Sequence, residues 1–308
     1  MICHFCCRTC DISEGRLGAC GVRTVKEGIL QDTAYGRLVS FAVDPVEKKP
    51  LYHFLPGSRT VSIAMSGCNF SCDFCQNWEI SQQPSVEGQF VDPEQVVMYA
   101  LEHGHPSISY TYSEPLVWQD YMLDVARIAK SHGILNVMVS NGSFSMEALA
   151  RILPLIDAYN IDLKGDAAFY AEICGGELSP VMEGIRAIAV HGSHLEVTTM
   201  LIEGLHTAAM VSELGGLLMS VGVNVWHLSR FFPRYHMEGR QATSERFLEE
   251  MLAVAVSSGV PFVYPGNSGL SAETYCPGCG ALVRAYPGLP VVKGVCSDCG
   301  KLIYGRWG

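Results

Sequence analysis

The sequence predicts an α/β protein, a full or partial (β/α) barrel that carries a cysteine-rich segment on each side. From about residue 58 to 270, short apolar, β-rich runs alternate with helical stretches, which is typical of a parallel sheet covered by helices. Cysteines cluster before this region, and two C-x₂-C-G knuckles follow it. We therefore expect three parts, at residues 1–57, 58–270 and 271–308.

The composition supports this division. A chain of 308 residues with 48% hydrophobic content is long enough for one barrel-sized domain with small additions. Its 13 cysteines cluster in C-x₂-C and C-x₃-C groups. This clustering and the odd number of cysteines favour metal binding over disulfides. The first residues lack the apolar core of a signal peptide, and no run reaches the length of a membrane span. We expect a cytoplasmic protein of an anaerobe with no membrane association, and the net charge of −10 does not suit nucleic-acid binding.

The N-terminal segment contains a complete set of four cysteines, Cys3, Cys6, Cys10 and Cys20. Four thiolates can close around zinc or hold a second iron–sulfur cluster, and the cysteine count does not separate the two. Zinc is our first choice. Residues 29–43 are expected to form a pair of short strands.

The first strand of the barrel is expected at residues 60–65, and a C-x₃-C-x₂-C run follows it at Cys68, Cys72 and Cys75. Three thiolates can hold three corners of a [4Fe–4S] cluster, whose irons normally bind four thiolates. The fourth iron then stays open to substrate or cosubstrate, as the open position does in a catalytic metal site. The motif therefore predicts a catalytic centre.

Further strands and helices alternate along the barrel. The remaining strands are expected at residues 107–112, 134–139, 157–162, 194–200, 224–229 and 261–264. Helices are expected between most of them, at 93–103, 116–132, 181–191, 211–221 and 244–257. In a barrel of this kind the chemistry lies at the C-terminal ends of the strands, which is where the three-cysteine loop falls.

Polar residues follow several strands and complete the candidate site. Glu114, after Ser113, offers a carboxylate that can accept hydrogen bonds from an ammonium group. Ser140 and Asn141 follow the third strand and could contact hydroxyl groups. These four positions lie at neighbouring strand ends.

Two further strand ends each leave an alternative open. Asp162 and Lys164 lie on one face of their strand because side chains alternate, so they either serve the site or form a buried ion pair. The sixth strand carries His227, and Arg230 lies at its end. His227 either contacts the ligand or is a core histidine with its hydrogen bonds satisfied.

The C-terminal segment contains two knuckles separated by sixteen residues. This C-x₂-C…C-x₂-C spacing is typical of a zinc ribbon, in which four sulfurs close a tetrahedral site. We expect a structural zinc here, with a redox dithiol as the alternative. The four ligands would be Cys276, Cys279, Cys296 and Cys299.

Taken together, these motifs resemble the radical S-adenosylmethionine (SAM) superfamily. Within it the chain resembles the pyruvate formate-lyase activating enzymes and, more closely, the radical SAM enzymes of the AmmeMemoRadiSam system. The resemblance rests on the N-terminal cysteines with Gly21-Val22-Arg23, on residues 44–57, on residues 67–81, on Tyr112 to Pro115, on residues 160–165 and on the terminal knuckles.

The resemblance implies a partial (β/α)₆ barrel, a [4Fe–4S] cluster on Cys68, Cys72 and Cys75, and SAM at its open iron. It further implies that SAM is cleaved reductively to a 5′-deoxyadenosyl radical, which takes hydrogen from a substrate. Glu114 would hold the SAM amino group, Ser140 and Asn141 would lie near the ribose, and Asp162 and Lys164 would line the site.

The partners implied are an electron donor, such as flavodoxin or ferredoxin, and a protein or peptide substrate. A small-molecule or nucleotide substrate is the alternative within the same chemistry. An alternative of a different class is a zinc- and cluster-bearing binding or redox-sensor protein that does not turn over SAM.

Overall fold

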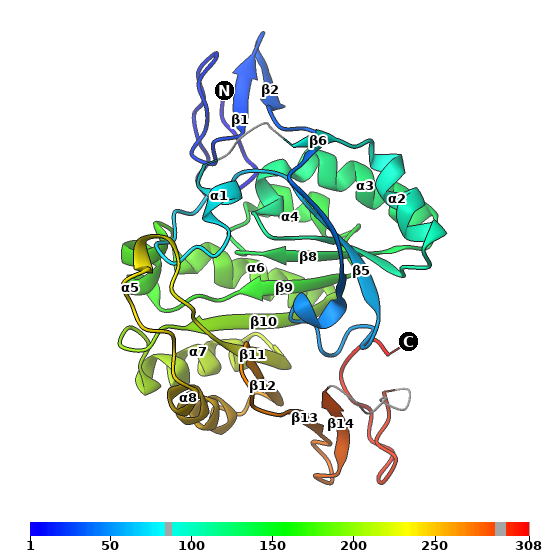
Figure 1. Cartoon of the computed structure of the whole chain (residues 1–308), viewed down its shortest axis with the longest axis vertical. Coiled ribbons are helices and arrows are strands. Elements are labelled where there is room, and N and C mark those ends of the chain that lie inside the picture. Colours follow the sequence, from blue (N-terminus) through cyan, green and yellow to red (C-terminus); the bar gives the residue numbers. More distant parts are fainter. Residues whose placement is uncertain (84–87, 287–293, 308) are drawn as a thin grey trace.

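A single eight-stranded sheet forms the centre of the computed structural model, which describes all residues except 84–87, 287–293 and 308 (Figure 1). Its strand order is β12-β11-β10-β9-β8-β7-β5-β4. The edge strand β4 (Ser40–Pro45) runs antiparallel to β5. The others run parallel to their neighbours, namely β5 (Arg59–Ala64), β7 (Ser107–Tyr110), β8 (Leu135–Ser140), β9 (Ala158–Asp162), β10 (His194–Leu201), β11 (Val225–Arg230) and β12 (Phe262–Gly266).

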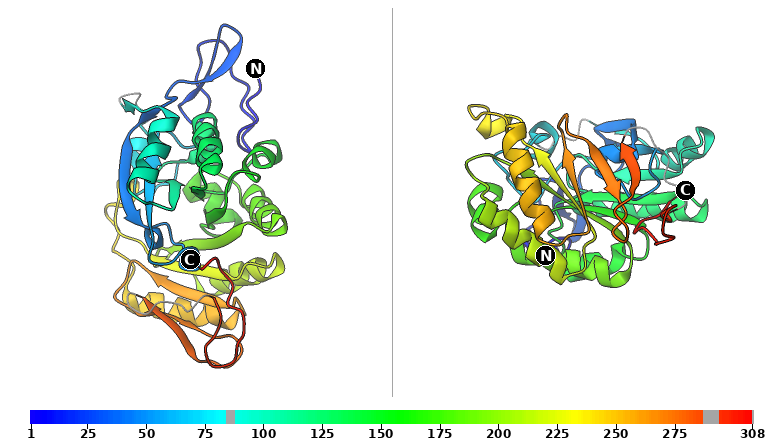
Figure 2. Two further views of the ribbon diagram at one scale, coloured as in Figure 1. Left: turned by 90° about the vertical axis from the view of Figure 1, so that its right-hand side faces the viewer. Right: turned by 90° about the horizontal axis from the view of Figure 1, so that it is seen from below.

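One principal helix follows each of the first six parallel strands. The helices pack on the outside of the curved sheet (Figure 2), and they are α2 (Pro93–Glu102), α3 (Gln119–Ser131), α4 (Met146–Ile152), α6 (Leu178–His191), α7 (Ala208–Ser220) and α8 (Glu245–Ser257). These six βα units confirm the predicted partial (β/α)₆ barrel, which β12 and β4 extend by one strand on each side.

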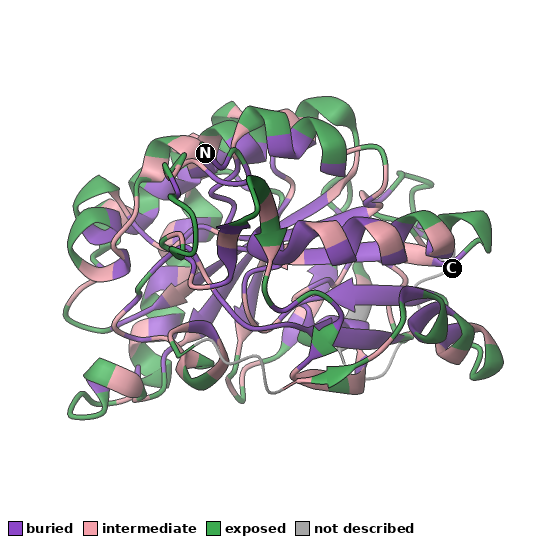
Figure 3. Cartoon of the chain, turned by 90° about the horizontal axis from the view of Figure 1, so that it is seen from above, coloured by how far each residue is buried: buried purple, intermediate pink, exposed green. Residues whose placement is uncertain are grey.

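Local sequence signals set the helix boundaries. The side chain of Asp92 accepts a hydrogen bond from the backbone N–H of Glu94 at 3.0 Å, and Gln95 accepts one from the N–H of Asp92 at 2.9 Å. This reciprocal capping, with Pro93 in the first helical position, starts α2. The helices bury one face against the sheet and expose the other (Figure 3), as their amphipathic spacing requires.

Polar side chains lie buried among the strands as well as apolar ones. Thr60 donates to the carbonyl of Ser107 at 3.1 Å and shares a 2.8 Å hydrogen bond with the hydroxyl of Ser109. Thr198 donates to the side-chain oxygen of Asn160 at 3.0 Å. These side chains are buried and hydrogen-bonded to one another, as burial of polar groups demands.

Short elements lie outside the barrel and before it. They are β1 (Arg23–Lys26), β2 (Ile29–Asp32), β3 (Arg37–Leu38), β6 (Gln89–Phe90), β13 (Ala272–Tyr275), β14 (Leu282–Tyr286), α1 (Trp78–Ser81), α5 (Ala167–Phe169), three 3₁₀ turns at Val46–Lys48, Pro115–Trp118 and Tyr235–Met237, and a π-helical turn at Tyr170–Cys174. Among the described residues, no helix is long and apolar enough to span a membrane.

Residues 29–43, where two short strands were expected, contain β2, β3 and the first part of β4. Strand β2 pairs with the preceding β1. The turn between them has Glu27 at φ 54° and Gly28 at φ 73°, and two positive φ angles suit a two-residue hairpin turn. Strand β3 pairs instead with β6.

Candidate active site

The three central cysteines lie in the loop between β5 and α1. Cys72 is buried, and Cys68 and Cys75 are half-buried. The backbone N–H of Ser71 donates to the carbonyl of Cys174 at 3.0 Å, which holds the loop against the segment after α5. The thiols therefore start from a supported loop at the C-terminal end of the first barrel strand.

Gly67, next to Cys68, accounts for the tight approach of the N-terminal segment. Its φ is +104°, and a Cβ atom at this position would lie 2.9 Å from the carbonyl oxygen of Cys20 and 2.8 Å from a methyl group of Val22. Only glycine fits both the backbone conformation and the space. The N-terminal segment is thus packed directly onto the three-cysteine loop.

The three cysteines line a cavity of about 320 Å³ at the strand ends. This volume falls in the range of small-molecule and cofactor sites. Every residue predicted for this site except His227 lines the cavity, namely Cys68, Cys72, Cys75, Ser113, Glu114, Ser140, Asn141, Asp162 and Lys164.

Glu114 is the most buried carboxylate of the cavity, with 2% of its surface exposed. Its Oε1 accepts hydrogen bonds from the Ser140 hydroxyl at 2.7 Å and the Leu116 N–H at 3.1 Å, and its Oε2 accepts one from the Asn141 N–H at 2.8 Å. Because a carboxylate offers about four acceptor positions, Oε2 keeps one for a ligand. Burial raises the pKa of Glu114 to about 7, although these hydrogen bonds oppose the shift.

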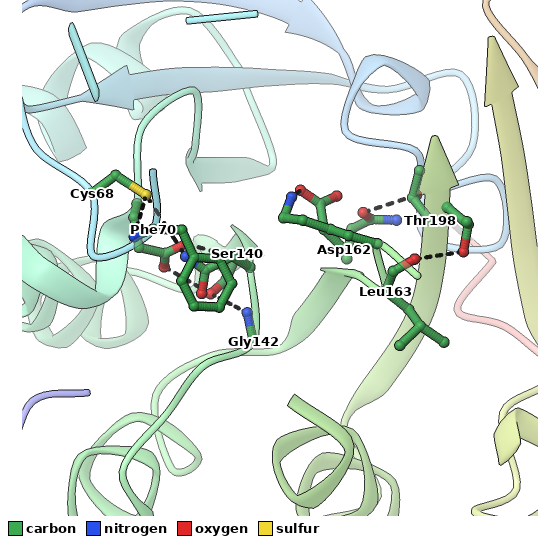
Figure 4. A network of polar contacts seen from close by, with 12 residues as sticks. Cys68, Phe70, Ser140, Gly142, Asp162, Leu163 and Thr198 are labelled. Carbon is green, nitrogen blue, oxygen red and sulfur yellow. Dashed lines mark hydrogen bonds and ion pairs between the residues drawn. The ribbon is translucent and has the colours of Figure 1, made fainter. Parts of the chain in front are cut away.

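Asn141 connects the end of β8 to the cysteine loop. Its amide nitrogen lies 3.7 Å from the Cys68 sulfur and donates to the Asn69 side-chain oxygen at 2.8 Å. Asn69 in turn donates to the Ser143 hydroxyl at 2.7 Å. Figure 4 shows Cys68 and Ser140 on one side of this region and Asp162 on the other.

Asp162 and Lys164 form an ion pair of 2.8 Å at the end of β9. Burial lowers the pKa of Lys164, but the Asp162 carboxylate and the nearby sulfurs of Cys72 and Cys174 outweigh burial and raise it well above its usual value. The lysine is therefore a fixed positive charge beside the cysteine loop. Both side chains are half-buried and line the cavity, so the pair faces the site rather than lying fully buried in the core.

His227 lies apart from the cavity. Its Nε2 is 2.7 Å from Oε2 of Glu196, a fully buried carboxylate on β10. Glu196 also contacts His194 at 2.9 Å through its Oε1. These contacts fit the core-histidine alternative, and His227 also lines the groove that adjoins the cavity, so its contact with a ligand stays a prediction.

Several residues that line the cavity were not singled out by sequence reasoning. Asn77 donates to the carbonyl of Tyr112 at 2.8 Å, and Gln76 donates to the carbonyl of Phe232 at 3.0 Å. Both belong to the Cys-Gln-Asn-Trp stretch at residues 75–78. That stretch was the sequence feature that could have indicated their place in the cavity. Lys48 also lines the cavity, and nothing in the local sequence places it there.

A groove of about 990 Å³ adjoins the cavity on the open side of the barrel. It lies between the segment that follows β4 and the segment that follows β12. The two spaces share Lys48, Tyr112, Thr198 and Ser229. The groove therefore gives a second ligand a route to the cysteine cavity.

The four cysteine sulfurs of the C-terminal knuckles lie close together. All four sulfurs, of Cys276, Cys279, Cys296 and Cys299, lie within 4.8 Å of one another. Each knuckle turns at a glycine, and Gly280 donates to the carbonyl of Cys276 at 2.9 Å. This arrangement can hold a tetrahedral metal ion such as zinc.

The cysteine loop fits a cluster that has an open position. Three thiols face one cavity, and the described part of the chain adds no fourth cysteine or histidine to its lining. Burial and the neighbouring Glu114 carboxylate raise the pKa of the Cys68 thiol well above its usual value, and a bound metal would favour the thiolate that binds it. Together, an open (β/α) barrel and a three-thiol cavity at its strand ends define a metal-dependent barrel enzyme.

The comparison with known protein families makes this class specific. The model of the radical SAM superfamily matches residues 62–214, which include the cysteine loop and the ends of β7, β8 and β9. The chain belongs to the radical SAM superfamily. Membership implies a [4Fe–4S] cluster and SAM as cofactors.

Two relatives and one solved structure illustrate the range of similarity. The uncharacterized protein MJ0808 of Methanocaldococcus jannaschii is 40% identical over 290 residues, covering 91% of this chain and 86% of that protein. The 7-carboxy-7-deazaguanine synthase of Methanothermobacter thermautotrophicus is 30% identical over 112 residues, covering 36% and 43%. The crystal structure of Streptococcus suis SuiB bound to its precursor peptide SuiA matches with a TM-score of 0.53 and 11% identity over 73% of this chain and 52% of that one, a likeness of fold alone.

Proposed function

We propose that this protein is a radical SAM enzyme that abstracts hydrogen from a protein or peptide substrate, in the manner of the activating enzymes. The observation that carries the proposal is the gathering of Cys68, Cys72 and Cys75 in one cavity with the polar strand ends. The cluster, held by these thiolates with SAM on its open iron, would supply a 5′-deoxyadenosyl radical from SAM once an external donor such as flavodoxin or ferredoxin provides one electron. The electron donor and the kinship with the AmmeMemoRadiSam enzymes belong to the same proposal.

The protein's own residues orient SAM and exclude water from the cavity. The free acceptor position on Oε2 of Glu114 would receive an N–H of the SAM amino group, a charge-assisted contact. Ser140 and Asn141 stand beside that carboxylate and would lie near the ribose. The positive charge of Lys164 beside Cys72 offsets the negative charge of the thiolates.

The groove supports a substrate larger than a metabolite. It is about three times the volume of the cysteine cavity, and it lies at the open edge of the barrel, where an extended segment can enter from the side. The relative that is a 7-carboxy-7-deazaguanine synthase favours a small-molecule substrate as the second candidate.

The SAM chemistry can be tested by anaerobic reconstitution followed by dithionite, SAM and an assay for 5′-deoxyadenosine. We expect product from the wild type, and none from Cys72→Ala, which should also lose the catalytic cluster while keeping its secondary structure. The matched control is Cys174→Ala, because Cys174 lies beside Cys72 but does not line the cavity. A reduced wild-type cluster that yields no product with SAM would support the redox-sensor alternative.

The substrate class can be tested with a cell extract separated into a protein fraction and a low-molecular-weight filtrate. Substrate should stimulate 5′-deoxyadenosine formation. Stimulation by the protein fraction, abolished by protease treatment, supports the proposal. Stimulation by the filtrate alone would favour a small molecule.

A further inference from the structure

The four N-terminal cysteines gather at a place of their own, separate from the cavity described above. Cys3, Cys6, Cys10 and Cys20 all line one small cavity. The backbone supports the arrangement, since the N–H of Cys3 donates to the carbonyl of Cys10 at 2.8 Å. The structure thus brings the four predicted ligands together, and the open question is which metal they bind.

The spacing of the sulfurs distinguishes zinc from a cluster. Zinc–sulfur bonds of about 2.3 Å in a tetrahedral site place the sulfurs about 3.8 Å apart, and the four C-terminal sulfurs lie within 4.8 Å of one another. Among the residues that the structure describes, no other group of three or more metal-ligating side chains meets that 4.8 Å limit. The N-terminal four therefore resemble the wider set of Cys68, Cys72 and Cys75. Wide spacing suits a cluster because each thiolate binds a different iron.

A buried arginine beside these sulfurs indicates a negatively charged occupant. Arg23 lines the same cavity and is 1% exposed. Its Nε donates to the carbonyl of Val117 at 2.7 Å and its Nη1 pairs with Asp120, but its Nη2 is buried with no hydrogen-bond partner. Such an unsatisfied donor is costly. A metal centre with four thiolates carries a net negative charge and would accept from it.

We propose that Cys3, Cys6, Cys10 and Cys20 bind a second [4Fe–4S] cluster rather than zinc. This assignment reverses the first choice of zinc made from the sequence. The choice of a cluster over zinc depends on the sulfur spacing, and the unsatisfied Arg23 supports a negatively charged metal centre of either kind. It does not require that the proposed SAM chemistry be correct.

The position of this site suits a role in electron transfer to the cluster at Cys68. That role rests on the proposed function. The side chain of Asn69 lies close to Cys6, and it accepts a hydrogen bond from Asn141, which contacts Cys68. The side chain of Arg8 donates to the carbonyl of Asn69. An external one-electron donor would reduce the N-terminal cluster, which would return to its oxidised state by passing that electron to the cluster at Cys68, with no bond or proton transferred.

The metal content of a triple variant tests the cluster assignment. We would reconstitute the C68S/C72S/C75S protein anaerobically with iron and sulfide and measure iron, sulfide and zinc per chain. We expect about four irons and four sulfides with one zinc from the C-terminal site. Two zinc ions and no iron would overturn the assignment, and the result does not depend on SAM cleavage.

A matched pair of neighbouring cysteines tests the ligand set and the electron route. Cys6 lines the N-terminal cavity, whereas Cys7 lies 3.2 Å from the Ser143 hydroxyl and does not line it. In the otherwise wild-type protein, Cys6→Ser should halve the iron content and slow reduction of the remaining cluster by reduced flavodoxin by more than an order of magnitude. Cys7→Ser should match the wild type in both. Full iron content in Cys6→Ser would refute the ligand set, and an unchanged reduction rate would refute the electron route.

If the triple variant does not fold, as judged by circular dichroism, the iron counts of wild type, Cys6→Ser and Cys7→Ser decide the question. About eight irons in the wild type support the second cluster. About four in all three proteins would refute it.

Discussion

Replacing Glu196 should strongly destabilise the barrel. Glu196 is fully buried on β10. Its two oxygens accept the backbone N–H groups of Tyr52 at 2.9 Å and His53 at 2.7 Å, and they contact the Nε2 atoms of His194 at 2.9 Å and His227 at 2.7 Å. One side chain therefore ties the segment after β4 to β10 and β11.

The hydrogen bonds set the magnitude. Each buried donor left without a partner costs roughly 1–3 kcal/mol, and breaking a buried ionic network typically costs 3–5 kcal/mol in total. In Glu196→Ala, some of the donors that lose their partner will hydrogen-bond to water instead. We therefore expect a loss of about 4 kcal/mol in the free energy of unfolding. At about 2 °C per kcal/mol for a chain of this size, the melting temperature should fall by about 8 °C. Glu196→Gln keeps the shape and one acceptor oxygen, and should lose about half as much.

The assay is thermal unfolding of the metal-loaded proteins at one scan rate, followed by circular dichroism. The control is Glu249→Ala, an exposed glutamate of α8, which should change stability by less than about 0.5 kcal/mol. A melting temperature of Glu196→Ala within 2 °C of the control would mean, by the conversion used above, that the four contacts contribute little. The reasoning from buried unsatisfied donors would then be wrong for this site.

Three further predictions concern the metal, pH and SAM. Cys279→Ser should lower the zinc content measured by mass spectrometry and leave the catalytic iron in place; loss of iron instead would show that the metals are assigned to the wrong sites. Burial lowers the pKa of His53 to about 4, so the unfolded chain takes up protons first and stability should fall as the pH drops from about 6.5 towards 4. In His53→Gln the melting temperature should depend less on pH between about 6.5 and 4. An equal dependence of melting temperature on pH in both proteins would contradict this explanation. Glu114→Gln should weaken SAM binding, measured by equilibrium dialysis, roughly tenfold above pH 7. The difference from wild type should shrink below pH 7, because burial raises the pKa of Glu114 to about 7. Equal affinities of the two proteins for SAM at pH 8 would exclude the contact.

The parts of the fold and site that were predictable depend on local patterns. Apolar runs and amphipathic stretches located the strands and helices, and parallel topology then brings residues at the strand ends to one place. Asp162 and Lys164 illustrate this: strand alternation predicted a shared face, and their charged atoms lie 2.8 Å apart. Glu114 and Asn141 meet for the same reason, since β7 and β8 are adjacent and parallel.

The unpredicted features depend on contacts between distant segments. His227 and Glu196 are 31 positions apart in sequence, and Glu196 and His53 are 143 apart, so no local pattern indicates that they meet. The metal at the N-terminal cysteines is similar, because residue types give the ligands but only distances between sulfurs separate a single ion from a cluster. The groove also escapes sequence reasoning, since it forms between segments after the first and last strands of the sheet.

The contacts around His53 also constrain the order in which this chain can fold. The His53 ring bonds to the carbonyl of Tyr304, 251 positions away, and the backbone of Arg306 pairs with that of His53 and Leu55 at 2.8 Å each. Contacts this distant in sequence form late, because a long loop must close first. During synthesis, all of the barrel strands emerge before these residues do. The contacts between residues 53–55 and 304–306 are therefore among the last to form, after every strand of the barrel has been made.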